Sequence, residues 1–186
     1  MGENIEDEIF YVNPPHCLGC RQCELSCAQA HMDTTLAEAV LNCVPIVKRI
    51  RVVSVDGVSV PLQCRQCEEA PCLLSCPMRA ISRKNGVVSV NESYCVGCKI
   101  CELVCPFGAI EVGKEKTSQH QEARSVAKKC DRCEEWRLKN NQDECACVLA
   151  CPTKTLKLLD IAAYRRKLSE SRAREIVCSH NALNKE

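Results

Sequence analysis

The chain has 186 residues and a formal net charge of +1, with 19 cysteines but only one Trp, three Tyr and two Phe to fill a core. Lys and Arg concentrate around residues 114–139 and 165–174, but no stacking aromatic side chains accompany them, which argues against a nucleic-acid-binding protein. No stretch reaches the roughly 20 apolar residues of a membrane span. The acidic N-terminus lacks the apolar core and twin arginine of an export signal. We therefore expect a cytoplasmic protein, from a setting low in oxygen, with reduced cysteines.

Short strands alternate with cysteine-rich loops along the chain. Asp56-Gly57 and Asn85-Gly86 are typical hairpin turns, and apolar alternation predicts that the first strand pairs with the last. The polar residues 114–127 are expected to form an excursion from the body. The predicted strands are residues 9–13, 50–55, 58–60, 87–90, 109–112 and 155–159, and the predicted helices are residues 35–42 and 161–186.

Sixteen of the cysteines form four motifs that each end in a Cys-x-x-x-Cys step. The odd total and the metal-ligand spacing argue against a disulfide scaffold. The third motif has the spacing of bacterial ferredoxins, in which three thiolates bind one 4Fe-4S cluster and the fourth binds the other cluster of a pair. In chain order the motifs are Cys17, Cys20, Cys23, Cys27; Cys64, Cys67, Cys72, Cys76; Cys95, Cys98, Cys101, Cys105; and Cys130, Cys133, Cys147, Cys151.

If the fourth cysteine of each motif binds the cluster of a partner motif, the motifs must work in pairs. The predicted pairs are the second motif with the third and the first motif with the fourth. The sequence therefore predicts four 4Fe-4S clusters. The expected ligand sets are Cys17, Cys20, Cys23 with Cys151; Cys130, Cys133, Cys147 with Cys27; Cys64, Cys67, Cys72 with Cys105; and Cys95, Cys98, Cys101 with Cys76.

The fourth motif leaves alternatives open. Cys130 and Cys133 with a distant cysteine pair are also compatible with a structural zinc site. Cys145 competes with Cys147 for the third position, and the three-residue spacing to Cys151, shared with the other motifs, favours Cys147. The thiols outside the motifs are expected to be small buried or surface side chains. They are Cys43, Cys145 and Cys178.

The fold class expected is α+β, with two pseudo-symmetric bacterial-ferredoxin-like lobes built from short β-hairpins, an inserted helix and hairpin, and a C-terminal helix. The clusters form much of the core, so metal-free protein should be largely unfolded. Apolar residues beside the ligands are expected to exclude water from the clusters. These are Leu18, Val96, Val104, Phe107 and Val148. Residues 1–160 form the expected four-cluster domain, with an outer lobe from 9–62 and 128–160, an inner lobe from 63–127, and a tail from 161–186.

The tail has no role in cluster binding. Asp160 is expected to cap a helix on which Ile161, Tyr164 and Leu168 form an apolar stripe among basic residues. We expect this helix to attach the protein to a partner subunit or a second copy. The alternative is a helix that closes over its own lobe.

Apart from the cysteines, the sequence shows no group of residues typical of a catalytic site and no Gly-rich phosphate-binding loop. We therefore do not expect an enzyme. His16 and His31 flank the first motif. Either could donate a hydrogen bond or influence a cluster potential, although a surface histidine beside a loop is the commoner case.

The segments HCLGCRQCELSCAQAH, CRQCEEAPCLLSCP, CVGCKICELVCPFGAI and CVLACPTKTL, within residues 9–160, resemble the four-cluster iron-sulfur subunits of molybdenum oxidoreductases, formate dehydrogenases, hydrogenases and carbon monoxide dehydrogenases. Segment VPLQCRQCEEAPC and the helix with His31 are most similar to the iron-sulfur protein associated with carbon monoxide dehydrogenase. The resemblance implies an electron-transfer subunit between carbon monoxide dehydrogenase and a hydrogenase or a flavin-dependent NAD(P) reductase. The alternatives are a formate dehydrogenase or hydrogenase complex, or a freely diffusing polyferredoxin.

Overall fold

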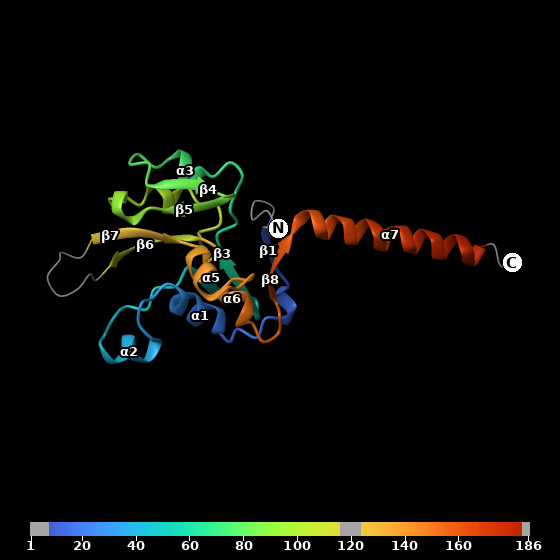
Figure 1. The fold of residues 1–186 in the computed structure, drawn as a ribbon, viewed down its shortest axis with the longest axis horizontal. Coiled ribbons are helices and arrows are strands. Elements are labelled where there is room, and N and C mark those ends of the chain that lie inside the picture. The colour runs from blue at the N-terminus through green and yellow to red at the C-terminus, as the bar shows by residue number, and fades with distance from the viewer. Residues whose placement is uncertain (1–7, 116–123, 184–186) are drawn as a thin grey trace.

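The computed structural model describes residues 8–115 and 124–183, and it is an α+β protein as expected from the sequence. Its strands form four separate two-stranded antiparallel sheets (Figure 1). The strands are β1 (Glu8–Val12), β2 (Ile50–Val55), β3 (Val58–Gln63), β4 (Ile81–Lys84), β5 (Val87–Val90), β6 (Ile110–Glu115), β7 (Arg124–Lys129) and β8 (Leu156–Asp160). The helices are α1 (Gln22–Ala30), α2 (Leu36–Leu41), α3 (Pro71–Leu74), α4 (Ile100–Leu103), α5 (Glu134–Asn140), α6 (Ala146–Leu149) and α7 (Ile161–Leu183).

The pairing of the first strand with the last is confirmed. Strand β1 runs antiparallel to β8, with Phe10 opposite Leu158 and Val12 opposite Leu156. Phe10 and Leu156 are buried, while Ile9 and Tyr11 on the other face are more than 40% exposed. This alternation is the pattern of a half-buried strand pair, and it brings the first and fourth cysteine motifs together.

The predicted hairpin, the turn at Asn85-Gly86 and the inserted helix are confirmed, and β4 is a strand that the sequence analysis did not predict. Asp56-Gly57 joins β2 to β3, and Asn85-Gly86 joins β4 to β5. All four turn residues have positive φ, which such tight hairpin turns require. Helix α2 begins after Thr35, whose hydroxyl accepts a hydrogen bond from the Glu38 N–H while the Glu38 carboxylate accepts one from the Thr35 N–H.

The expected excursion over residues 114–127 is wrong at both ends, because residues 114–115 belong to β6 and residues 124–127 to β7. Residues 124–129 form β7, which pairs with β6 so that Val112 faces Ala127. Val126 and Ala127 are each 1% exposed. Charged neighbours hide this short buried run in the sequence, and the strand forms because its apolar residues complete the core beneath β6. The rest of that prediction, residues 116–123, lies outside the described residues.

Two apolar cores lie side by side, and cysteines contribute to both. The first joins Phe10 and Leu156 to Ile50, Val148 and cysteines of the first and fourth motifs. The second joins Ile81, Val88, Ile110 and Val126 to cysteines of the second and third motifs. Cys64 is an exception, because it belongs to the second motif but packs in the first core.

Helix α7 points away from the rest of the protein (Figure 1). The Asp160 carboxylate accepts a hydrogen bond of 2.9 Å from the Ala163 N–H, so the predicted cap is confirmed. Every side chain from Tyr164 to His180 is exposed. The helix therefore does not close over its own lobe, and its 23 residues extend about 35 Å at the usual helical rise.

Candidate metal centres

Each cysteine motif folds as a loop that leads into a short helix. Proline follows the fourth cysteine in the last three motifs and prevents the helix from continuing. Ala28 takes that place in the first motif, and α1 continues to Ala30. The third cysteine lies inside the helix in every case: Cys23 in α1, Cys72 in α3, Cys101 in α4 and Cys147 in α6.

The four loops share one backbone feature. The residue two places after the first cysteine has a positive φ in each, namely Gly19, Gln66, Gly97 and Arg132. In such turns successive N–H groups point into the concave side and can bind an anionic centre. Glycine is required at Gly97, where a Cβ atom would lie 2.5 Å from the Ser125 carbonyl oxygen. Because Gln66 and Arg132 adopt the same conformation without being glycine, the loops are built alike.

Thiols of the first and fourth motifs come together. Burial raises the pKa of the Cys23 thiol to about 11, and Glu24 and the nearby Cys151 and Cys20 sulfurs raise it further. Cys151 thus lies beside the first motif, as the crossing of fourth cysteines predicts, and Cys17 begins the same loop.

The remaining thiols of these two motifs form a second group. Burial raises the pKa of Cys147, and the neighbouring Cys130, Cys133 and Cys27 sulfurs raise it further. Cys151 lies beside Cys23 instead. Cys147 and Cys151 therefore have different neighbours, as expected if the last cysteine of each motif crosses to its partner.

Thiols of the second and third motifs form two further groups. Burial raises the pKa of Cys72; the charge of Lys129 opposes this shift, and the nearby Cys64 and Cys105 sulfurs add to it.

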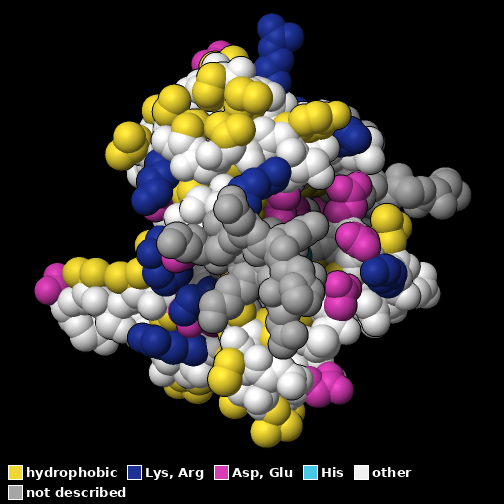
Figure 2. All heavy atoms as spheres, turned by 90° about the vertical axis from the view of Figure 1, so that its left-hand side faces the viewer, with side chains coloured by type: hydrophobic (Ala, Val, Ile, Leu, Met, Phe, Trp, Pro, Cys, Tyr) yellow, Lys and Arg dark blue, Asp and Glu magenta, His cyan; other side chains and the backbone are white. Residues whose placement is uncertain are grey.

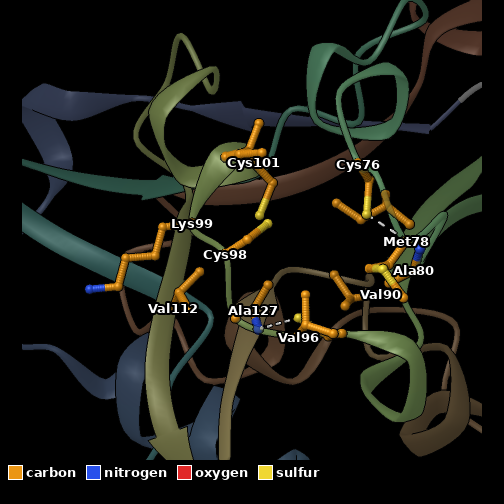
Figure 3. Close-up of a pocket in the computed structure, with 14 residues that line it drawn as sticks. Cys76, Met78, Ala80, Val90, Val96, Cys98, Lys99, Cys101, Val112 and Ala127 are labelled. Atoms are coloured by element: carbon orange, nitrogen blue, oxygen red, sulfur yellow. Dashed lines mark hydrogen bonds between the residues drawn. The ribbon is translucent and has the colours of Figure 1, made fainter.

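The other group lines a hollow formed by Cys76, Cys95, Cys98 and Cys101 together with apolar residues such as Met78 and Val112. In Figure 3 the labelled Cys76, Cys98 and Cys101 side chains point into this space. Burial raises the pKa of Cys101 to about 11, and the Cys95 and Cys98 sulfurs contribute next.

Backbone N–H groups donate to several of these sulfurs. Such bonds stabilise thiolates and influence the potential of a bound cluster. Ala80 and Ala109, each four residues after the last cysteine of a motif, use the same geometry (Figure 3 shows the first). The bonds are Arg49 N to Cys27 (3.3 Å), Ala80 N to Cys76 (3.3 Å), Ala109 N to Cys105 (3.4 Å), Ala127 N to Cys95 (3.3 Å) and Gln66 N to Cys64 (3.4 Å).

Cys145 is a buried thiol that lies beside Cys130, Cys133 and Cys147. It is 0% exposed, and its S–H donates to the Arg132 carbonyl oxygen over 3.1 Å. A hydrogen bond between the Cys145 and Cys133 side chains is the main reason why the pKa of Cys133 falls to about 7. Cys43 and Cys178 are exposed. Cys145 therefore supports the loop that carries Cys133, a role that the sequence did not reveal.

His31 is not the surface histidine that was the commoner expectation. Its Nδ1 donates to the Cys27 carbonyl oxygen (2.7 Å) and its Nε2 to Asp131 (2.9 Å). Burial lowers the pKa of His31, but hydrogen bonds with the Asp131 carboxylate and the Cys27 sulfur outweigh it and raise the pKa to about 10. Arg49 also binds Asp131. His16, in contrast, is exposed.

The apolar residues expected to shield the clusters are mostly at the surface. Val148 is 2% exposed, but Leu18 is 70%, Val96 58% and Phe107 46% exposed, and Val104 is also exposed. Being next to a ligand in sequence does not decide on which side of the loop a side chain lies. Figure 2 shows apolar side chains gathered at the upper end of the molecule, the end that carries α3 and β4 in Figure 1.

The residues present fit 4Fe-4S clusters. A cubane needs four thiolates, and the thiols meet in groups drawn from the first with the fourth motif and from the second with the third. Burial raises the pKa of Cys130 and Cys147 and opposes their ionisation. A bound cationic metal core offsets that opposition.

Comparison with known proteins agrees with this chemistry. The model of a family described as a 4Fe-4S dicluster domain matches residues 55–161. An iron-sulfur protein of Rhodospirillum rubrum is 49% identical over 181 residues, 96% of this chain and 95% of that protein. The electron transport protein HydN of Escherichia coli is 36% identical over 165 residues, 85% of this chain and 91% of that protein. Formate hydrogenlyase subunit 2 of Escherichia coli is 35% identical over 170 residues, covering 77% of each chain.

These relatives and the matched family confirm the expected cofactor type and the expected electron-transfer role. Within the described residues, no helix is both long and apolar enough to cross a membrane. The family match covers more than half of the 186 residues and includes three of the four motifs. The chain belongs to the 4Fe-4S dicluster domain family and is an iron-sulfur electron-transfer protein.

Proposed function

We propose that the chain conducts electrons through four 4Fe-4S clusters, each bound by three cysteines of one motif and the last cysteine of its partner motif. The grouping of the thiols is the observation that supports this assignment. The clusters are the first-motif cluster (Cys17, Cys20, Cys23, Cys151), the fourth-motif cluster (Cys130, Cys133, Cys147, Cys27), the second-motif cluster (Cys64, Cys67, Cys72, Cys105) and the third-motif cluster (Cys95, Cys98, Cys101, Cys76).

The clusters follow one another in the order first-motif, fourth-motif, second-motif, third-motif. Neighbouring cysteines support the two outer steps, Cys23 with Cys147 and Cys72 with Cys101. At the central step, the Gln66 side chain donates to the Cys130 carbonyl oxygen over 2.9 Å and so joins the two loops, and Cys64 and Cys130 belong to the same core.

The two ends of this line are the points where electrons enter and leave. Cys20 in the first-motif cluster and Cys98 in the third-motif cluster are exposed, whereas Cys64 and Cys130 in the middle are buried. The exposed Leu18 and the exposed Val96 flank the two end clusters. Apolar side chains around an exposed cluster supply the contact area that a redox partner needs.

The partner we propose is the catalytic part of a formate dehydrogenase or hydrogenase complex in the cytoplasm. The 35% identity to formate hydrogenlyase subunit 2 supports this choice. Carbon monoxide dehydrogenase is the second candidate, supported by the likeness of residues 60–72 to its associated iron-sulfur protein. The comparisons therefore favour a formate dehydrogenase or hydrogenase complex over carbon monoxide dehydrogenase as the partner.

Helix α7 is the proposed attachment to this partner. Residues 161–180 contain five Lys and Arg and two Glu, a net charge of +3. The helix leaves the body directly after β8, at the end of the strand where Asp160 is opposite Glu8. An acidic surface of the catalytic subunit complements this charge. A freely diffusing ferredoxin has no use for such an extension.

Anaerobic purification of the tagged chain from its own cells tests the proposal. We expect a brown complex with a catalytic subunit, and we expect formate or hydrogen to bleach the visible absorbance as the clusters are reduced. Reduction by carbon monoxide alone would identify the second candidate. A brown chain that copurifies with no other subunit would be a free ferredoxin, and an iron-free native chain would refute the proposal.

A further inference from the structure

Lys129 is a buried cation at the joint between the two lobes. It is 2% exposed, and its ammonium donates to the carbonyl oxygens of Val88 and Cys130, the latter over 3.0 Å. Among the described residues, no carboxylate forms an ion pair with it. A buried charge is strongly disfavoured unless an opposite charge compensates it.

The surroundings hold the ammonium in a fixed place. Gln66 bridges the same two residues as Lys129, because its side chain accepts from the Val88 N–H (2.8 Å) and donates to the Cys130 carbonyl (2.9 Å). Val88 and Cys130 are buried as well. The four residues form a closed ring of hydrogen bonds, so the ammonium has little freedom to move toward solvent.

This position lies between two of the proposed clusters. Cys130 is a ligand of the fourth-motif cluster, and Lys129 is bonded to its carbonyl oxygen. The charge of Lys129 also acts on the Cys72 thiol of the second-motif cluster, whose pKa it lowers against the effect of burial. A 4Fe-4S core with four thiolates is anionic, and it supplies the opposite charge that the protein does not.

We infer that Lys129 compensates the negative charge of the two central clusters and raises their reduction potentials relative to the end clusters. The inference rests on the ligand sets proposed above. One-electron reduction adds one negative charge to a cluster, and no bond is formed or broken. A nearby fixed cation favours the reduced state, because it stabilises the added charge in a medium of low dielectric constant. Lys129 thus favours the reduced state of the second-motif and fourth-motif clusters over that of the two end clusters.

Replacement of the charge tests the inference. We expect Lys129→Gln and Lys129→Met to make two of the four potentials more negative, with about a tenfold smaller equilibrium constant for reduction, which is about 59 mV for one electron. The other two potentials should stay unchanged. Lys129→Arg should keep values close to those of the unmodified protein. Lys139→Gln, on the exposed surface of α5, is the matched control and should shift none of them.

The measurement is an anaerobic redox titration monitored by electron paramagnetic resonance, with the iron content of each variant determined first. If Lys129→Gln keeps its full iron content and all four potentials are unchanged, Lys129 only holds Val88 and Cys130 together by hydrogen bonds, and the inference is wrong. If the neutral variants lose iron, Gln66→Glu decides instead, because it keeps the lysine and cancels its charge. The same two potentials should fall, and unchanged potentials in that variant would overturn the inference. An unmodified protein with fewer than four clusters would refute the ligand sets rather than the role of the charge.

Discussion

Serine in place of Cys147 removes one thiolate from the proposed fourth-motif cluster and leaves the backbone of α6 in place. Cys147 is 3% exposed and lies beside Cys130, Cys133 and Cys27, so water cannot readily replace its sulfur. Four clusters contain about sixteen irons and as many sulfides. We expect the Cys147→Ser variant to retain about twelve of each, because a cubane lacking one thiolate is lost while the other three remain.

Cys145 offers a matched control two residues away. Its S–H donates to the Arg132 carbonyl oxygen over 3.1 Å, and a serine hydroxyl can make the same bond. Cys145→Ser should therefore keep about sixteen irons. Cys145→Ala leaves the Arg132 carbonyl without this donor, which costs about 1–3 kcal/mol. That variant should keep its iron but lose its clusters at a lower denaturant concentration.

Chemical analysis of iron and sulfide, together with cluster counts by electron paramagnetic resonance, separates these outcomes. Loss of a cluster from Cys145→Ser, with a full complement in Cys147→Ser, would mean that Cys145 is the ligand and that the repeated three-residue spacing is misleading. One zinc per chain beside about twelve irons would show that the fourth motif binds a different metal.

Removal of iron by anaerobic chelation should abolish most far-ultraviolet circular dichroism, because the cysteines supply much of both cores and ligation energy is folding energy; a retained spectrum would contradict this. Truncation of residues 163–186 should leave the iron content unchanged and weaken copurification with the catalytic subunit, whereas normal copurification would move the docking surface to the cluster loops. Leu103→Glu, at a side chain 84% exposed on α4, should slow electron exchange with a partner at the third-motif end without loss of iron, as measured by stopped-flow absorbance. Glu24→Gln should lower the denaturant midpoint of cluster loss, since the buried Glu24 carboxylate accepts from Lys48 and from the Val52 N–H (2.6 Å), and bonds to a charged group are worth about 1.5–3 kcal/mol.

Local features were predictable from the sequence because a few neighbouring residues determine them. Cysteine spacing sets which thiolates can reach one cluster. The turns at Asp56-Gly57 and Asn85-Gly86 depend on residues that tolerate positive φ, and the helix after Thr35 depends on its capping box. Strand β7 was missed for the same reason, since its buried Val126 and Ala127 lie among charged residues and show no clear alternation.

The sequence by itself determined the cofactor chemistry, the repeat of the motifs and the α+β class. Only the tertiary structure decided what surrounds the thiols, because those contacts join residues far apart in the chain. His31 and Asp131 are separated by 100 positions, and Lys129 and Val88 by 41. The exposure of Leu18 and the outward direction of α7 likewise depend on how distant elements pack together. The spacing of cysteines within a motif identifies the cluster ligands. The burial and the charges around those ligands arise from packing between distant segments, which no short segment of sequence encodes.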